Sequence, residues 1–248
     1  GIRFAHAMGV LTSTDSIDAI LKGPQICEIV FDATSAEAHI GHAKILKKLG
    51  KFTVDMTPSR IGKMCIPVIN LAECLSYPNV NMISCGGQDT TPLIAQIAKI
   101  HPQISYVEIV SSIASKSAGI ATRDNIDEYT QTPCDGIVEF TGIPRVKAII
   151  ILNPAEPPII MHNTIYALVK KPKLAQLTRE IRKVVGKIRE YVPGFRLTGG
   201  PVFENGRLTV MNEVEGLGDF LPKWAGNLDI INCAAIKVAE EYAKRKRN

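Results

Sequence analysis

The stretch that decides the fold of this chain is Asn79-Val80-Asn81-Met82-Ile83-Ser84-Cys85-Gly86-Gly87-Gln88. Its alternating apolar run predicts a strand that enters a core and stops at a cysteine followed by two glycines. The next residues predict a helix, because Thr90 or Thr91 can cap it and Pro92 suits its first turn. We therefore expect Cys85 on a strand-to-helix turn, just ahead of a helix N-terminus.

Cys85 is the candidate nucleophile of the chain. The partial positive charge at a helix N-terminus favours thiolate over thiol. Gly86 and Gly87 remove the side chains that would crowd an incoming substrate. The alternative is a buried, inert cysteine at a strand end, since free cysteines are often buried.

Strand and helix patterns alternate through residues 26–100. Strands are expected at 26–31, 52–56, 66–70 and 80–83, and helical segments at 37–49, 71–75 and 93–100. This alternation predicts an α/β fold with a doubly wound parallel sheet. Ligands of such folds bind at the carboxyl ends of the strands, where residues 32–35, residues 57–59 and Cys85 are expected.

The start of the sequence lacks a dinucleotide-binding fingerprint. Such a sheet begins with a strand, a glycine-rich loop and a helix, yet the sequence contains no G-x-G-x-x-G. Residues 1–21 predict only a helical fragment. We therefore expect the sequence to begin inside such a domain, after its first βαβ unit.

The second half of the chain predicts longer strands and amphipathic helices. Strands are expected at 104–114 and 147–152, and an apolar stripe over 174–191 predicts a helix with a charged outer face. Asn205-Gly206, between two strand-like segments, predicts a β-hairpin. Residues 115–125 form a small-residue loop, which either brings backbone N–H groups to a ligand or is an ordinary polar connection.

Composition excludes several classes of protein. The chain has 248 residues, 46% of them hydrophobic, which permits one large or two modest domains. No apolar run reaches the roughly 18–20 residues of a membrane span, and no secretory signal is visible. The six cysteines include no C-x-x-C pair, which favours a reduced cytoplasmic protein over a disulfide framework.

Two polar motifs have a functional and a plain interpretation. His39 and His42 have the spacing of metal ligands, but no matching cluster follows, so we expect a solvated helix face and no metal site. Net charge is +5, and much of it lies in residues 244–247. We interpret this tail as a solvated helix end rather than a nucleic-acid-binding segment, because no basic stripe with interleaved aromatic residues accompanies it.

Five segments together resemble one family, the acylating acetaldehyde dehydrogenases, which make acetyl-CoA. They occur in the family's order across nearly the whole chain and comprise residues 31–36 (FDATSA), 81–88 (NMISCGGQ), 117–128 (SAGIATRDNIDE), 151–158 (ILNPAEPP) and 213–230 (from EVEGLGD to AGNLDI). The family's glycine-rich loop is the part without a match, in agreement with the expected start inside the domain.

The resemblance implies two domains. A Rossmann-type NAD-binding domain would comprise residues 1–84, without its first βαβ unit, and be rejoined by 224–248. An α+β catalytic and dimerisation domain like that of glyceraldehyde-phosphate dehydrogenase would comprise 85–223. By the same resemblance Cys85 matches the acyl-thioester nucleophile. The segments that match the family's NAD contacts are Ser117, Ala118, Gly119, Ile120, Ala121, Thr122, Arg123, Asp124, Asn125 and Asn227.

The resemblance also implies the reaction and the partner. Acetaldehyde would be oxidised by NAD with coenzyme A as co-substrate, giving acetyl-CoA and NADH. The implied partner is 4-hydroxy-2-oxovalerate aldolase, which passes acetaldehyde through a shared channel to a homodimer within a hetero-oligomer. The implied pathway is the end of aromatic or sterol ring catabolism.

One position departs from the family. The family commonly carries Asp in the stretch matched by Met161-His162-Asn163-Thr164, where it is thought to assist the cysteine, and this chain has Asn163. An amide can orient a thiol but cannot take its proton. Two rival interpretations stay open. One is a semialdehyde or phosphorylating dehydrogenase with the same cysteine chemistry, and the other is a catalytically silent partner of the aldolase, which the missing glycine-rich loop and Asn163 suggest.

Overall fold

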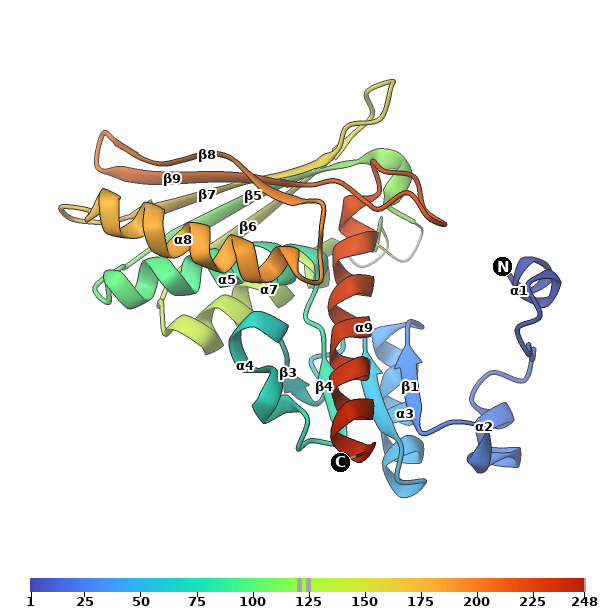
Figure 1. Ribbon diagram of the computed structural model, residues 1–248. Helices are drawn as coiled ribbons and strands as arrows, with labels where there is room; N and C mark the ends of the chain where they lie inside the picture. The colour runs from blue at the N-terminus through green and yellow to red at the C-terminus, as the bar shows by residue number, and fades with distance from the viewer. Residues whose placement is uncertain (120–121, 124–125, 248) are drawn as a thin grey trace.

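The computed structural model describes residues 1–119, 122–123 and 126–247, and two sheets organise them (Figure 1). The smaller sheet has the strand order β1-β2-β4-β3, and every pairing in it is parallel. Its strands are β1 (Ile29–Asp32), β2 (Phe52–Asp55), β3 (Lys63–Met64) and β4 (Asn79–Asn81), connected by α3 (Ala36–Lys48) and α4 (Pro67–Cys74). The predicted parallel sheet is confirmed.

The larger sheet is mixed and has the order β6-β5-β7-β9-β8. Its strands are β5 (Val107–Ala114), β6 (Val146–Asn153), β7 (Met161–Leu168), β8 (Phe195–Glu204) and β9 (Arg207–Val214). The helices α5 (Cys85–Ile100), α7 (Ile126–Thr141) and α8 (Leu174–Arg189) cover one face, and the other is left open (Figure 1). Apolar side chains between the sheet and these helices form the larger core, which includes the predicted stripe of α8.

The last helix, α9 (Gly226–Arg247), connects the two sheets (Figure 1). Ala234, Ala235 and Val238 are buried in the smaller core with the apolar residues of β2 and β4. Near the end of the helix the Tyr242 ring stacks on Phe52, with 3.8 Å between ring centroids. A segment far along the chain thus completes the hydrophobic core of the parallel sheet.

The predicted hairpin is also confirmed. Asn205 and Gly206 join β8 to β9 with φ of 51° and 78°. Positive φ at both central residues is the geometry of a type I′ turn, whose twist matches that of the flanking strands. Asparagine and glycine adopt this conformation at the lowest steric cost.

The expected strand at 66–70 is wrong. The structure has the short β3 (Lys63–Met64) followed at once by α4, which begins at Pro67. Proline suits a first helical position because it lacks an N–H and has a helical φ. The Asn70 side chain then secures the turn, accepting from Ile66 N–H at 3.0 Å and donating to the Met64 carbonyl at 2.9 Å.

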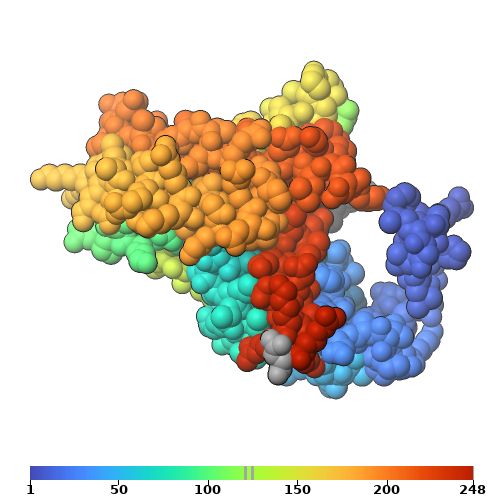
Figure 2. Space-filling model, viewed as in Figure 1, coloured from blue at the N-terminus to red at the C-terminus, as the bar shows by residue number. Residues whose placement is uncertain are grey.

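The N-terminal segment stands away from the rest of the chain (Figure 2). The expected helical fragment forms two short helices, α1 (Ile2–Ala7) and α2 (Asp18–Lys22), which η1 (Pro24–Ile26) connects to β1. Phe4 reaches Phe220 with 5.2 Å between ring centroids. Within the described residues, no helix combines the length and the apolar character that a membrane crossing requires.

The stack between Tyr242 and Phe52 gives a first prediction. Tyr242→Ala should lower the free energy of unfolding by about 2–3 kcal/mol, because it removes a packed ring and leaves a cavity against β2. The exposed Tyr77 supplies the matched control, since Tyr77→Ala should change stability by about 0.5 kcal/mol or less. Urea denaturation measures both, and equal losses would show that the stack does not hold α9 to the sheet.

Candidate active site

Three polar side chains lie in one row at the carboxyl ends of the parallel strands. Asp32 on β1 is in register with Asp55 on β2, which is in register with Asn81 on β4, and all three are buried. Each carboxylate accepts from the threonine two residues later. Thr34 Oγ1 donates to Asp32 at 2.5 Å, and Thr57 Oγ1 donates to Asp55 at 2.7 Å. The row therefore fixes the two loops that follow β1 and β2.

His39, on α3, joins the first two members of this row. Its Nδ1 lies 2.8 Å from Asp32 and its Nε2 lies 3.4 Å from Asp55. His42 Nδ1 also bonds Asp32, at 2.9 Å. Burial alone would raise the pKa of Asp32, but hydrogen bonds from the two imidazoles and from Thr34 outweigh it and hold that pKa well below its usual range.

The prediction that His39 and His42 lie on a solvated helix face is wrong for His39. His39 is fully buried, because its Nδ1 bonds the buried Asp32 carboxyl and its Nε2 bonds the Asn79 amide at 2.9 Å, with the buried Asp55 carboxyl 3.4 Å away. Among residues 1–119, 122–123 and 126–247, no group of three or more His, Cys, Asp or Glu side chains has the arrangement of a metal site. In the structure these imidazoles support the ends of the strands.

Asn81 connects the row to the turn before Cys85. Its Nδ2 donates to Asp55 at 2.7 Å and to the Thr57 carbonyl at 3.1 Å, and its Oδ1 accepts from Ile83 N–H at 2.9 Å. Ile83 has φ of 64°, a left-handed conformation that is rare for a β-branched residue. Such backbone persists only where its surroundings enforce it, and the Asn81 amide is one such constraint.

The helix begins earlier than the sequence predicts. Ser84 is the N-cap of α5, with its Oγ accepting from Gly87 N–H at 3.1 Å, so Cys85 is the first helical residue. Thr90, Thr91 and Pro92 lie inside the helix and do not start it. The sequence places Gly86 and Gly87 in the turn before the helix. In the structure the Ser84 cap and the tight packing of Gly87 on Ile83 bring both glycines into the first turn of α5.

Cys85 is neutral in this environment, contrary to the thiolate expected from its position. Burial is the main cause that raises the pKa of the thiol, to about 11, and the charge of Asp89 adds to it. Hydrogen bonds from the N–H groups of Gly86 and Cys85 act in the opposite direction. The helix N-terminus is therefore present, but desolvation outweighs it, and attack by sulfur requires removal of the thiol proton.

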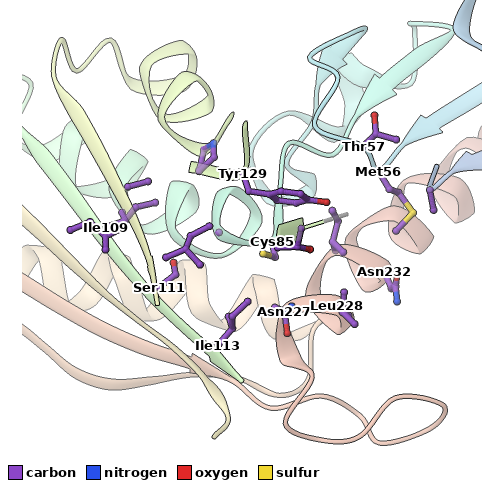
Figure 3. A pocket seen from close by; sticks show the side chains of 18 of the residues that line it. Met56, Thr57, Cys85, Ile109, Ser111, Ile113, Tyr129, Asn227, Leu228 and Asn232 are labelled. Atoms are coloured by element: carbon purple, nitrogen blue, oxygen red, sulfur yellow. The ribbon is translucent and has the colours of Figure 1, made fainter. Parts of the chain in front are cut away.

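Cys85 lies in a pocket of about 230 Å³ between the two sheets (Figure 3). The loops after β1 and β2 form one wall, β5 and β6 a second, and the starts of α5 and α9 a third. Tyr129 on α7 contributes its ring, as Figure 3 shows. The lining is mostly apolar and includes Ala33, Thr34, Met56, Thr57, Cys85, Gly86, Ile109, Ser111, Ile113, Thr122, Tyr129, Ile150, Asn227 and Leu228.

The structure brings some of the predicted cofactor contacts to this pocket. Thr122 and Asn227 line it beside Cys85. Ser117 closes η2 (Ser115–Ser117) by donating to the Ala114 carbonyl at 2.8 Å, and Ala118 is buried next to it. The other predicted members, Ile120, Ala121, Asp124 and Asn125, lie outside the described residues.

Arg123 and Gly119 shape the loop without lining the pocket. Arg123 Nε donates to the Ala118 carbonyl at 3.0 Å, and its Nη2 donates to the Ser115 carbonyl at 2.9 Å. The guanidinium is thus used within its own loop. Gly119 has open space around it, since an added Cβ would meet no heavy atom within 4 Å.

Asn227 is a buried polar residue in the lining of the pocket. Its side chain is almost fully buried at the start of α9, yet its Oδ1 has no hydrogen-bond partner. A buried acceptor without a partner carries a free-energy penalty that a bound donor would remove. Asn227 therefore combines a place in the pocket lining with an amide oxygen that is not hydrogen-bonded within the described residues.

Asn163 does not line the pocket. It lies buried on β7, where its Nδ2 donates to Asp89, and Asn212 on β9 donates to the other oxygen of the same carboxyl. Sequence reasoning missed Asp89, Asn212 and Tyr129. Asp89 stood four residues after the candidate nucleophile, which was a signal, but its partners lie 74 and 123 residues away, and only the folded sheet places them together.

Comparison with known proteins identifies the family. Residues 85–222 match the model for the dimerisation region of prokaryotic acetaldehyde dehydrogenases. The chain is 50% identical to an acetaldehyde dehydrogenase of Geobacillus stearothermophilus, over 99% of this chain and 84% of that protein. The chain belongs to the acetaldehyde dehydrogenase family. A second relative, the acetaldehyde dehydrogenase of Pectobacterium atrosepticum, is 49% identical over 97% of this chain and 82% of its own.

The structural comparison supports the same fold at a greater distance. Aspartate semialdehyde dehydrogenase II of Vibrio cholerae, solved with its bound ligand, superposes with a TM-score of 0.59 and 12% identity, over 88% of this chain and 78% of that one. Membership of the acetaldehyde dehydrogenase family makes this protein an oxidoreductase of the aldehyde dehydrogenase type, a class that uses a nucleotide cofactor.

The matched dimerisation region supports a homodimer. The open face of the larger sheet carries half-exposed apolar side chains, among them Ile151, Leu168, Val202 and Met211. On β7 and β9 the exposed positions, which include Leu168 and Met211, alternate with the buried positions that face the covering helices. Large apolar side chains grouped on an exposed face are typical of a protein–protein interface.

The two glycines after Cys85 give a second prediction. A Cβ at Gly87 would lie 2.6 Å from Ile83 Cγ2, whereas one at Gly86 would make only an ordinary 3.6 Å contact with Ser111 Oγ. Gly87→Ala should therefore destabilise the protein by about 1–3 kcal/mol through overpacking against a strained turn. Gly86→Ala should leave stability unchanged or improved, since alanine favours helix, while it narrows the pocket.

Thermal unfolding and aldehyde oxidation together separate the two glycine variants. We expect Gly87→Ala to lose stability and activity, and Gly86→Ala to keep its stability but raise KM for the aldehyde. A stable, fully active Gly87→Ala protein would contradict this account of the turn.

Proposed function

We propose that this protein oxidises acetaldehyde and other short aldehydes with NAD and coenzyme A, giving acetyl-CoA and NADH. The observation that carries the proposal is the position of Cys85, the first residue of α5, inside a mostly apolar pocket at the carboxyl ends of the parallel strands. Among the described residues that line this pocket, none is Arg, Lys or His. A small neutral aldehyde suits such a lining.

The proposal includes a division of labour between two parts of the chain. Residues 1–84 and 224–248 would bind NAD, and residues 85–223 would carry the thiol and the dimer interface. The two hydrophobic cores support this division, because α9 contributes Ala234 and Val238 to the core of the parallel sheet. The apolar residues of α5, α8 and the larger sheet form the other core.

The described residues fit a nicotinamide cofactor at the pocket. The buried Oδ1 of Asn227 lacks a donor, and a nicotinamide carboxamide would supply one. Thr34 and Thr57, held by Asp32 and Asp55, would line the approach on the side of the parallel sheet. Bound NAD would serve as the acceptor of the hydride that leaves the substrate carbon.

Cys85 would act as the covalent catalyst. Its thiol proton is removed as the sulfur adds to the aldehyde carbon, which gives a thiohemiacetal oxyanion, and loss of hydride converts this oxyanion to a thioester. The N–H groups of Cys85 and Gly86, which face the sulfur, are donors for the developing oxyanion. The thiol of coenzyme A then attacks the thioester carbon, and the Cys85 sulfur leaves.

The proposed assembly has two kinds of partner. The homodimer would pair through the open face of the larger sheet, and 4-hydroxy-2-oxovalerate aldolase would supply acetaldehyde to it. The enzyme would then act in the cytoplasm, at the end of aromatic or sterol ring catabolism. Delivery through a shared channel suits a small, reactive aldehyde that would otherwise diffuse away.

The rival functions have weaker support. A semialdehyde or phosphorylating dehydrogenase binds an anion and needs a cation beside the thiol, but Arg123 is bound to carbonyls of its own loop. A catalytically silent partner of the aldolase has no need of an unpartnered amide oxygen at a pocket that also holds a thiol. The site therefore favours the coenzyme A-dependent enzyme.

Cofactor dependence gives a third prediction. NADH should accumulate only with acetaldehyde, NAD and coenzyme A together, apart from one burst per Cys85 without coenzyme A. Cys85→Ser should lose at least about three orders of magnitude in rate, since a neutral hydroxyl is a poor nucleophile without a base. Cys233→Ser, outside the pocket lining, is the matched control and should keep its activity. Steady production of acetate without coenzyme A would refute the proposal.

Cofactor binding gives a fourth prediction. Asn227→Ala should weaken NAD binding by about tenfold, the loss of one buried hydrogen bond, without slowing acyl transfer from a preformed thioester to coenzyme A. Gly119→Leu should also weaken binding, because the loop has free space that a ligand would share. The equally open Gly186, on α8, provides the control Gly186→Leu. Calorimetric titration with NAD measures the dissociation constant of each variant. Unchanged dissociation constants for Asn227→Ala and Gly119→Leu would refute the assignment.

A further inference from the structure

Asp89 follows Cys85 by four residues on α5, so the two side chains share one face of the helix. At that spacing the Cβ atoms of a helix lie about 5–6 Å apart. Helical side chains also lean toward the N-terminus, which directs Asp89 toward the turn that holds Cys85. Burial is the main cause that raises the pKa of the Cys85 thiol, and the charge of Asp89 adds to the rise.

The larger sheet supplies amides to this carboxyl. Ser111 on β5, Asn163 on β7 and Asn212 on β9 are in register and form one row across the sheet. The helix crosses this row, with Gly86 near the pocket-lining Ser111 and Asp89 on the two asparagines. The row thus leads from the pocket to a fully buried carboxyl one turn along α5.

The amide pair suits both protonation states of Asp89. Each asparagine donates its Nδ2 to one carboxylate oxygen, which satisfies the anion. The Oδ1 atoms of Asn163 and Asn212 are buried and lack partners. Rotation of either amide by a half-turn would present an acceptor to a protonated carboxyl. A site that binds only the carboxylate form of Asp89 would not need the two unpaired Oδ1 atoms as acceptors.

The surroundings set the affinity of this carboxyl for a proton. Burial raises the pKa of Asp89 to about 7, and the hydrogen bond from Asn212 opposes part of that rise. On β7 and β9 the neighbouring charged or titratable residues, His162 and Glu213, point to the opposite face of the sheet, because side chains alternate along a strand. The core face of α8 is apolar, and Tyr129 on α7 and Cys85 are the titratable groups at the pocket.

We propose that Asp89 accepts the proton of the Cys85 thiol when the sulfur adds to the aldehyde, directly or through one water molecule. In this step the S–H bond breaks and an S–C bond forms. The carbonyl π pair moves to oxygen, and the proton ends on Asp89. The inference rests on the proposed function of Cys85 and adds the group that a neutral, partly buried thiol requires. Asn163, which cannot take a proton itself, becomes a positioning residue for Asp89.

The first experiment measures the pre-steady-state NADH burst against pH, without coenzyme A, for the wild type and for Asp89→Asn. The wild-type rate should rise with pH through a midpoint near 7, where Asp89 becomes able to accept a proton. Asp89→Asn should lose that midpoint and be slower by about 10²–10⁴-fold at neutral pH. At high pH, where the thiol ionises without help, the two rates should approach each other.

A second pair of variants moves the proton acceptor without deleting it. Asn212→Ala removes a donor to the anion, so the midpoint of the burst profile should shift to higher pH. The exchange Asp89→Asn with Asn163→Asp places the carboxyl at the other end of the same hydrogen bond. This double variant should recover at least about tenfold of the rate that Asp89→Asn loses, since general-base assistance is restored. A structural role alone would move stability but not the midpoint.

Stability against pH gives an independent check on the fold of these variants. A carboxyl whose pKa is raised on folding makes the protein less stable as pH rises from about 4, its unfolded value, to about 7. Asp89→Asn should lack that decline. Urea denaturation at several pH values measures it.

The outcomes separate the proposed function of Cys85 from the proposed role of Asp89. If the wild type shows no burst, the proposed function fails before Asp89 is tested. If the wild type bursts and Asp89→Asn bursts as fast or faster with the same midpoint, Asp89 is only a charge that opposes the thiolate, and the inference is overturned. If Asp89→Asn does not fold, the midpoint of Asn212→Ala decides in its place.

Discussion

The interaction on which the site depends is the buried pairing of Asp55 with Asn81 at the ends of neighbouring parallel strands. Asp55 receives Asn81 Nδ2 at 2.7 Å, and the same amide holds the N–H of Ile83 two residues later. The strained turn at Ile83 then delivers Cys85 to the first position of α5. This bond is one of the constraints that hold Ile83 in its left-handed conformation, and the position of the thiol depends on that turn.

The row of Asp32, Asp55 and Asn81 also explains how the parallel sheet and the mixed sheet form one pocket. The parallel sheet contributes strand ends and short loops, fixed by carboxylates that bond their own following threonines. The mixed sheet contributes an apolar wall and the helix-facing amides of β7 and β9. The helix α5 contacts both sheets, because its N-terminus follows the end of β4 in the parallel sheet and its apolar residues pack on the mixed sheet. The pocket lies where the two meet.

Local sequence was enough to predict much of the framework. The alternation of strands and helices, the Asn205-Gly206 turn and the apolar stripe of α8 are all local patterns, and the structure confirms them. The predictions that failed were those of where two helices begin. Ser84 prevailed over Thr90 and Thr91 as the cap of α5, and Pro67 started a helix within residues read as a strand.

The polar interior could not be predicted in the same way. The sequence predicts a solvated His39 because the residues that it contacts, Asp32, Asp55 and Asn79, lie on three different strands. The thiol of Cys85 looked activated because the helix N-terminus is visible in sequence, whereas the burial that opposes it is a property of the whole fold. Both errors have one origin, since desolvation depends on residues distant in the chain.

Burial of the thiol also explains why the site needs an acceptor for its proton. An exposed cysteine at a helix N-terminus can ionise without help, but it also reacts with oxidants and other electrophiles. Cys85 is only partly exposed, at the wall of a mostly apolar pocket, and its reactivity then depends on a group that shares these desolvated surroundings. A solvated carboxylate with a pKa near 4 would be too weak a base for this role. Burial raises the proton affinity of Asp89 for the same reason that it keeps Cys85 neutral, so a single physical cause creates both the requirement and the group that meets it.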